Sequence, residues 1–124
     1  LFYFSGHGLQ IEGKNYLTSI DSSFVDSISA KYTSIPLDEV MEYMQQNKTI
    51  IKILILDACR NNPLPERGVN KGLAPIHAPK GTIIAFSTSP GETAMDYGAG
   101  RNSIYTGALL NHIDDKNIPI EDFF

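Results

Sequence analysis

A histidine and the only cysteine of this chain each follow an apolar run. His7 comes after LFYFSG, and Cys59 comes after ILILDA. A cysteine thiol needs a base to become a thiolate at neutral pH, and imidazole is the usual base because its pKa lies near neutrality. The two residue types therefore predict nucleophilic chemistry at Cys59, with His7 managing the proton. The alternative is that Cys59 is a small buried thiol that caps a core strand, as most lone cysteines are.

The elements that must position these residues are two predicted strands. The segment from Thr49 to Asn62 reads TIIKILILDACRNN, and Leu1–Phe4 is also apolar and aromatic. Short, continuous, β-branched-rich runs are typical of strands buried on both faces, as in a parallel sheet with helices on either side. Ligands and chemistry gather at the carboxyl edge of such sheets. The separation of 59 − 7 = 52 residues leaves room for a crossover between neighbouring parallel strands.

The crossover helix is predicted over Ser34 to Asn47. Ser34 is a suitable N-cap and Pro36 falls in the first turn. Apolar residues recur at i, i+3, i+4 and i+7, which predicts one buried face; they are Leu37, Val40, Met41 and Met44.

The remaining segments predict a hairpin, a loop, a third strand and two helices. Leu9–Leu17 alternates around a Glu-Gly turn and predicts a small hairpin. The Ser-rich and Asp-rich stretch Thr18–Thr33 predicts a surface loop. Gly81–Ser87 predicts another buried strand, Asn102 is a suitable N-cap for a helix through Ile113, and Ile118–Phe124 predicts the beginning of another helix.

Several motifs resemble one known family. FYFSGHG together with DACRNNP resembles the caspase-like cysteine peptidases, peptidase family C14. HGLQIEGKNYLTSID, SPGETAMD and GRNSIYTGALL are similar to the metacaspase and bacterial caspase-homologue branch. The resemblance covers nearly the whole chain, and the histidine-to-cysteine spacing matches the caspase pattern. Asp57 and Asn61 stand where the animal caspases have Gln and Gly.

The resemblance implies an α/β caspase-like fold, a mostly parallel sheet flanked by helices. In the family two strands precede the SGHG strand, so residues 1–124 are expected to be a fragment of a single catalytic domain that lacks the first strands. Residues 1–62 then correspond to the end of the large-subunit-like part with the His/Cys dyad, residues 63–80 to a linker-like loop, and residues 81–124 to the small-subunit-like part. The proline-rich, basic stretch Arg60 to Lys80 is expected to be mobile and to be cut after Arg67, Lys71 or Lys80.

The activity that the resemblance implies is that of a cysteine endopeptidase. Cys59 would attack the peptide carbonyl and His7 would carry the proton to the leaving amine. The backbone amides of Gly8 and Cys59 would form the oxyanion hole, and a glycine at position 8 would keep the approach to that amide open. His77 is the weaker candidate for the base because no predicted strand supports it.

The substrate expectation comes from three residues. Asp57 lies two residues before Cys59, Ser5 lies two before His7, and Asp96 follows the Ser-Pro-Gly turn; all three match substrate-pocket positions of the basic-specific relatives. Two carboxylates and a hydroxyl suit Arg or Lys before the scissile bond and repel Asp. The alternative is that Asp57 caps the strand end and that Asp96 is a solvated loop acid.

Cofactors and partners are limited by composition. No cofactor and no metal site is expected. Calcium activation is frequent among metacaspases, but Asp21 and Asp26 are better interpreted as solvated acids than as ligands, because calcium loops need several closely spaced oxygen donors. The net charge of −4 argues against nucleic acid, and no apolar run is long enough to span a bilayer, so a cytoplasmic location is expected. An unpaired edge at Leu1–Ser5 predicts self-association.

Two alternatives come from other functional classes. The first is an inactive caspase-like fragment or pseudoenzyme that uses its cleft as a peptide-binding module, although both dyad residues are present. The second is a nucleotide-binding doubly wound domain. That class needs a glycine-rich phosphate loop, and SGHGL lacks both the GxGxxG spacing and a Walker lysine.

Overall fold

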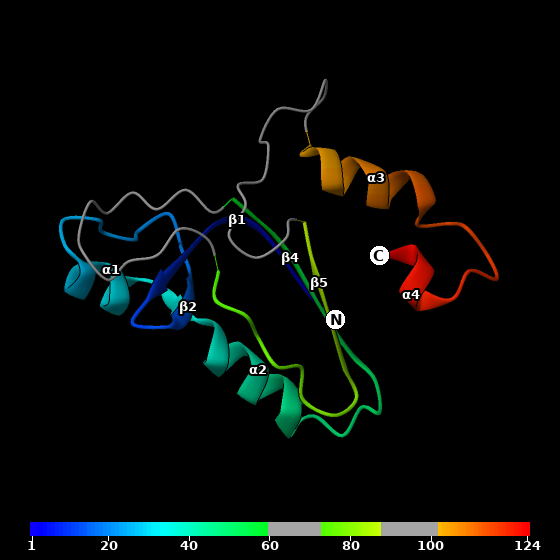
Figure 1. Ribbon diagram of the computed structural model, residues 1–124, viewed down its shortest axis with the longest axis horizontal. Helices are drawn as coiled ribbons and strands as arrows, with labels where there is room; N and C mark the ends of the chain where they lie inside the picture. Colours follow the sequence, from blue (N-terminus) through cyan, green and yellow to red (C-terminus); the bar gives the residue numbers. More distant parts are fainter. Residues whose placement is uncertain (60–72, 88–101) are drawn as a thin grey trace.

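The computed structural model (Figure 1) describes residues 1–59, 73–87 and 102–124. Its centre is one five-stranded sheet in the order β3-β2-β1-β4-β5. The strands are β1 (Phe2–Ile11), β2 (Lys14–Leu17), β3 (Ile35–Pro36), β4 (Lys52–Cys59) and β5 (Thr82–Phe86). The helices are α1 (Ser27–Thr33), α2 (Leu37–Gln46), α3 (Ile104–His112) and α4 (Ile120–Phe123).

The sheet is mixed, with a parallel centre and an antiparallel margin. β4 pairs in parallel with β1 on one side and with β5 on the other. β2 pairs antiparallel with both β1 and β3. The turn between β1 and β2 is Glu12-Gly13, and both residues have positive φ, 51° and 77°. Such a turn matches the twist of the two strands, so the predicted hairpin is confirmed.

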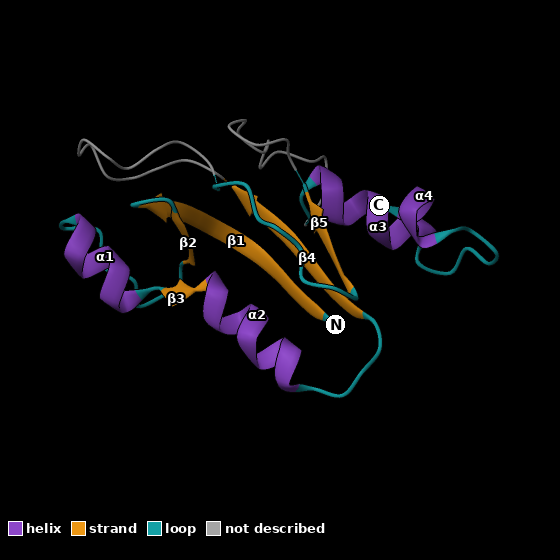
Figure 2. Ribbon diagram, turned by 60° about the horizontal axis from the view of Figure 1, so that its bottom comes forward, coloured by secondary structure: helices purple, strands orange, loops and turns teal. Residues whose placement is uncertain are grey.

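Helices cover the two faces of the sheet. Figure 2 shows α1 and α2 on one side of the sheet, with α3 and α4 near β5. α2 buries the stripe predicted from its sequence, because Leu37 is fully buried and Val40, Met41 and Met44 pack against the same cluster. The chain leaves β1 and β2, passes through α2 and returns into β4 parallel to β1, so the predicted crossover is confirmed.

Alternate residues of β4 face different helices. Leu54, Leu56 and Ala58 belong to the core cluster beneath α2, together with the partly buried Phe2 and Phe4 of β1. The other face, with Tyr3, Ile53 and Ile55, borders an apolar groove of about 660 Å³ whose far wall is α3 and α4. β4 is therefore buried on both faces, as its sequence predicts.

The strand that carries Cys59 begins later than its apolar run predicts. β4 starts at Lys52, and Ile50 and Ile51 are 90% and 64% exposed. The reason is pairing, since the register with β5 begins at Lys52 opposite Thr82 and no earlier residue has a strand neighbour on that side. Apolar character alone therefore did not predict the first residue of β4.

The start of α2 also differs from the prediction. The helix begins at Leu37, Pro36 occupies the N-cap position, and Ser34 does not cap it. Ile35 and Pro36 instead pair with Leu17 and Tyr16 of β2. A residue before proline is restricted to extended conformations, which suits a short strand and delays the helix.

The predicted surface loop Thr18–Thr33 contains a helix. Asp26 is the N-cap of α1, and its carboxylate accepts a hydrogen bond of 2.6 Å from the Ser29 amide. Hydrogen bonds from the backbone and the side chain of Ser29 lower the pKa of Asp26. Asp26 is therefore the capping residue of a helix, where the sequence predicted a plain surface loop.

The end of the predicted linker loop is packed against the sheet. Leu73 and Ala74 are buried, and the Asn15 side chain makes hydrogen bonds of 3.0 Å and 2.6 Å with the Ala74 carbonyl and amide. The expectation of a mobile loop is therefore wrong for Leu73 and Ala74. Arg67 and Lys71 lie outside the described residues, whereas Lys80 is described and exposed.

The described part of the chain contains neither a membrane-spanning helix nor a cluster of metal-binding side chains. None of its helices combines the length and the apolar character that crossing a membrane requires. Across residues 1–59, 73–87 and 102–124, no three His, Cys, Asp or Glu side chains gather as a metal site would require.

Candidate active site

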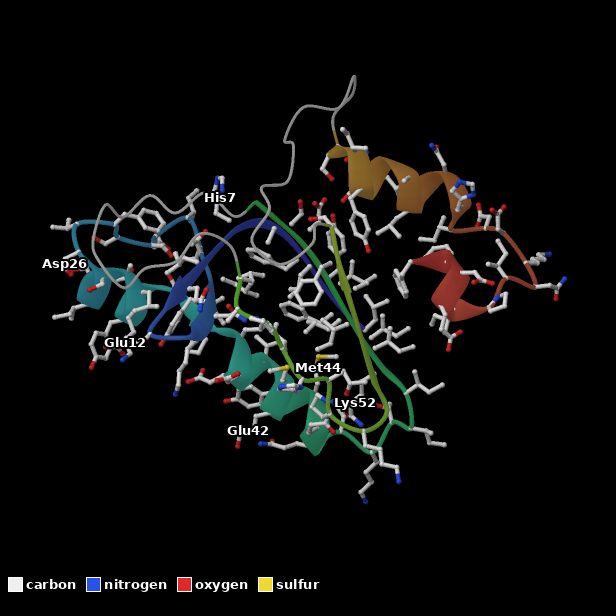
Figure 3. The ribbon with its side chains drawn as sticks, in the orientation of Figure 1. His7, Glu12, Asp26, Glu42, Met44 and Lys52 are labelled. Carbon is white, nitrogen blue, oxygen red and sulfur yellow. The ribbon has the colours of Figure 1, made fainter. Side chains whose placement is uncertain are left out.

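His7 and Cys59 are paired residues of neighbouring parallel strands. In the register of β1 and β4, His7 lies opposite Cys59 and Ser5 lies opposite Asp57. His7 lies within β1, at the last position that pairs with β4, and Figure 3 shows its exposed imidazole pointing away from the strands. Adjacent strands are about 4.8 Å apart, so the two backbone positions lie within the reach of a thiol and an imidazole.

The backbone at His7 is fixed by the chain that leaves the hairpin. The His7 carbonyl accepts hydrogen bonds from the Thr18 amide at 2.9 Å and from the Thr18 hydroxyl at 3.0 Å. These bonds continue the pairing of β1 with β2 past Gly8 and Leu17. The histidine is therefore held by regular strand pairing on the β4 side and by Thr18 on the other.

The need for glycine at position 8 has a different cause from the one predicted. A Cβ atom at Gly8 would lie 2.9 Å from Cδ2 of Leu73 and 3.5 Å from the Cβ of Ala58. Gly8 is buried on the α2 face, the face opposite His7. Its lack of a side chain makes room for Leu73, so the explanation based on substrate approach was wrong, while its amide stays a candidate oxyanion donor.

Asp57 is buried under the start of α3. It is 4% exposed, and its Oδ2 accepts hydrogen bonds from the hydroxyls of Ser103 and Thr106, the latter at 2.5 Å. Ser103 is the N-cap of α3, and its Oγ also accepts the Thr106 amide at 3.0 Å. Asp57 therefore ties the end of β4 to the first turn of α3.

The directions of these hydrogen bonds follow from the chemistry of the groups. A carboxylate only accepts, so the single hydroxyl proton of Thr106 points to Asp57. The contact of 2.6 Å between Tyr3 Oη and Thr106 Oγ1 must then be donated by Tyr3. The result is a directed chain from Tyr3 through Thr106 to Asp57, joined there by Ser103.

Two buried hydroxyls lie near this network. Tyr105 Oη and Ser87 Oγ have no hydrogen-bond partner among the described residues. Burial raises the pKa of Tyr105, and the negative charge of Asp57 raises it further. Ser87 directly follows β5, and its amide donates to the Leu56 carbonyl at 3.1 Å, which places it beside the end of β4. The surroundings of Asp57 are thus rich in hydroxyl groups.

Of the other predicted site residues, only Ser5 is found beside Asp57 in the described part of the chain. Ser5 is exposed and neighbours Asp57 in the register. Asp96 lies outside the described residues, and His77 is exposed on the segment that follows Ala74. Sequence reasoning missed Ser103 and Thr106. Their spacing of three at the start of a helix was a usable signal, because it puts both hydroxyls on one side of the first turn.

The comparison with family models covers the whole chain. The model described as the caspase domain, peptidase family C14, matches residues 1–124. The chain belongs to the caspase domain family. The mixed α/β sheet flanked by helices is the caspase-like fold that the sequence resemblance implies. Searches of curated proteins and of solved structures found no match.

The match places this chain in a family of peptidases. His7 and Cys59 form the last pair of the parallel ladder between β1 and β4, at the carboxyl end of β4.

Proposed function

We propose that this caspase domain is a cysteine endopeptidase that uses a Cys59–His7 dyad. The observation that carries the proposal is the register of β1 and β4, in which His7 and Cys59 are direct partners in the last pair of the parallel ladder. The family match adds the reaction class.

The proposed mechanism follows from the needs of acyl transfer. The Cys59 thiolate attacks the peptide carbonyl, and the protonated His7 gives its proton to the leaving amine. The backbone amides of Gly8 and Cys59 donate to the developing oxyanion. Water then attacks the thioester, with His7 as base, and releases the acid and the free thiol. No cofactor enters these steps.

The proposed substrates are proteins and peptides with a basic residue before the scissile bond. Asp57 supplies a negative charge two residues before the nucleophile, Ser5 neighbours it on β1, and Asp96 is the third proposed pocket residue. Buried carboxylates attract a guanidinium or an ammonium and repel a substrate carboxylate. Cleavage is therefore expected after Arg, less efficiently after Lys, and negligibly after Asp.

A panel of fluorogenic peptides that differ only in the residue before the cut tests this proposal. Wild-type protein should hydrolyse the Arg peptide at least about 100-fold faster than the Asp peptide, because reversing the charge of a substrate beside a buried carboxylate costs several kcal/mol. Cys59→Ala and His7→Ala should abolish turnover. Asp57→Ala should remove activity on the Arg peptide while iodoacetamide still alkylates Cys59.

Each control separates one assignment from the rest. Residual turnover in Cys59→Ala would point to a contaminating protease. Preferred cleavage after Asp by wild-type protein would refute the basic specificity and leave the dyad standing. Peptide binding without turnover in wild-type protein would favour the pseudoenzyme alternative.

A further inference from the structure

The Asp57 carboxylate is the one proposed pocket acid whose surroundings the structure describes, and its contacts are unequal between its two oxygens. Ser103 and Thr106 both donate to Oδ2. The hydrogen bonds that Asp57 accepts from described side chains all go to that one oxygen. A carboxylate has about four acceptor positions, two on each oxygen. The two α3 hydroxyls therefore occupy Oδ2, and no side chain in the described part of the chain donates to Oδ1.

The side from which a ligand can approach is given by β1. Asp57 itself is 4% exposed because the first turn of α3 lies over it. Ser5, its register partner on β1, is exposed, and so is His7 two residues further along. The side chain of a substrate bound at the dyad would therefore reach Asp57 from the side of β1, because α3 covers the other approach.

We propose that Ser103 and Thr106 are positioning residues of the substrate pocket, which hold the Asp57 carboxylate by Oδ2 and present Oδ1 to the basic side chain of the substrate. Tyr3 supports this arrangement by donating to Thr106 from the neighbouring strand. The inference rests on the proposed function. It goes further by naming the groups that set the specificity.

A consequence for specificity follows from the occupied oxygen. A guanidinium gains most over an ammonium when it binds both oxygens of a carboxylate as a fork. With Oδ2 occupied by two hydroxyl protons, the fork cannot form unless α3 gives up its bonds. Arg and Lys would then each make one charge-assisted hydrogen bond to Oδ1, so the Arg peptide should be preferred over the Lys peptide by less than about tenfold, which is less than one such bond is worth.

The test measures kcat and KM separately for matched Arg and Lys peptides. Thr106→Val keeps the shape of the side chain and removes the donor, and it should raise KM for both peptides about tenfold, the scale of one hydrogen bond to a charged group. The kcat value and the rate of Cys59 alkylation by iodoacetamide should stay near wild type. Thr106→Ser should restore KM. Thr49→Val, an exposed threonine before β4, is the matched control and should change neither constant.

Two further variants extend the test. Tyr3→Phe removes only the donor to Thr106 from a side chain that is 42% exposed, so it should fold normally and raise KM more weakly than Thr106→Val. The double variant Ser103→Ala/Thr106→Val frees Oδ2 for a guanidinium fork. It should lose activity on both peptides and raise the ratio of Arg to Lys turnover.

The outcomes distinguish this inference from the proposed function. If wild-type protein cleaves the Arg peptide and Thr106→Val leaves KM unchanged, the positioning role is refuted and the peptidase proposal stands. An equal loss on both peptides in the double variant would overturn the assignment of Oδ1. If wild-type protein hydrolyses neither peptide, the proposed function fails and this inference fails with it.

Discussion

At the scale of single residues, hydrogen bonding decides which acids have structural roles. Asp26 precedes α1 and Asp57 lies near the end of β4, and each carboxylate accepts hydrogen bonds from a different helix. Asp26 caps α1 through Ser29, and Asp57 accepts from the first turn of α3. The sequence predicted the strand-end position of Asp57, but it could not show the partners, because Ser103 and Thr106 are 46 and 49 residues away along the chain.

The cap at Asp26 predicts a pH dependence of α1. Its pKa is lowered from 3.8 in the folded state, so its contribution is present above that value and is lost as pH falls through the lower, folded pKa. We expect the Ser29 amide to exchange faster below pH 3.8 in wild-type protein. Asp26→Asn keeps an acceptor without the titrating charge, so its exchange, corrected for intrinsic rates, should not show this step. NMR-detected hydrogen exchange measures both, and an equal step in the variant would contradict the assignment.

At the scale of elements, the spacing of apolar residues was sufficient to predict which helix and strand faces are buried. The apolar stripe of α2 and the two-sided burial of β4 follow from local sequence, because burial selects residue types at fixed spacing. The first and last residues of these elements could not be predicted from local sequence, because they depend on pairing with strands that are distant in the sequence. β4 starts where β5 begins to pair with it. Ile35 and Pro36 adopt an extended conformation because they pair with β2.

The contact of Asn15 with Ala74 is an element-scale anchor that sequence reasoning did not find. Asn15→Ala would leave the amide and carbonyl of a buried residue without their partner, which costs about 3 kcal/mol of unfolding free energy. Urea unfolding measures the loss. Asn47→Ala changes an exposed asparagine at the end of α2 and should alter stability by less than about 0.5 kcal/mol. Similar effects of the two variants would show that the anchor is weak.

At the scale of the whole molecule, β1 offers a strand edge. β2 pairs with β1 only from Gly8 to Ile11, and among described residues no strand pairs with Phe2–His7 on the side away from β4. Unpaired edges recruit other strands. We propose that two copies of the chain associate through Leu1–Ser5, and sedimentation should show a mass that rises with concentration.

A pair of matched variants tests the edge. Leu1→Lys places a charge on a residue that is 82% exposed at the edge, and it should weaken association because charged edges resist pairing. Ile50→Lys makes the same kind of change at a residue that is 90% exposed and outside the strands. It should leave association unchanged. A concentration-independent monomer in wild-type protein would exclude the edge as an interface.

The pairing of β4 with β5 also determines what holds the molecule together. These strands come before and after residues 60–72 in the chain, yet they are hydrogen-bonded neighbours over five register pairs, from Lys52–Thr82 to Leu56–Phe86. Leu73 and Ala74 add contacts to Gly8 and Asn15, which belong to the first half. Non-covalent contacts therefore join the two halves independently of the peptide bonds between them. A molecule cut after Arg67 or Lys71 would be a two-chain complex that retains the sheet and the His7–Cys59 register.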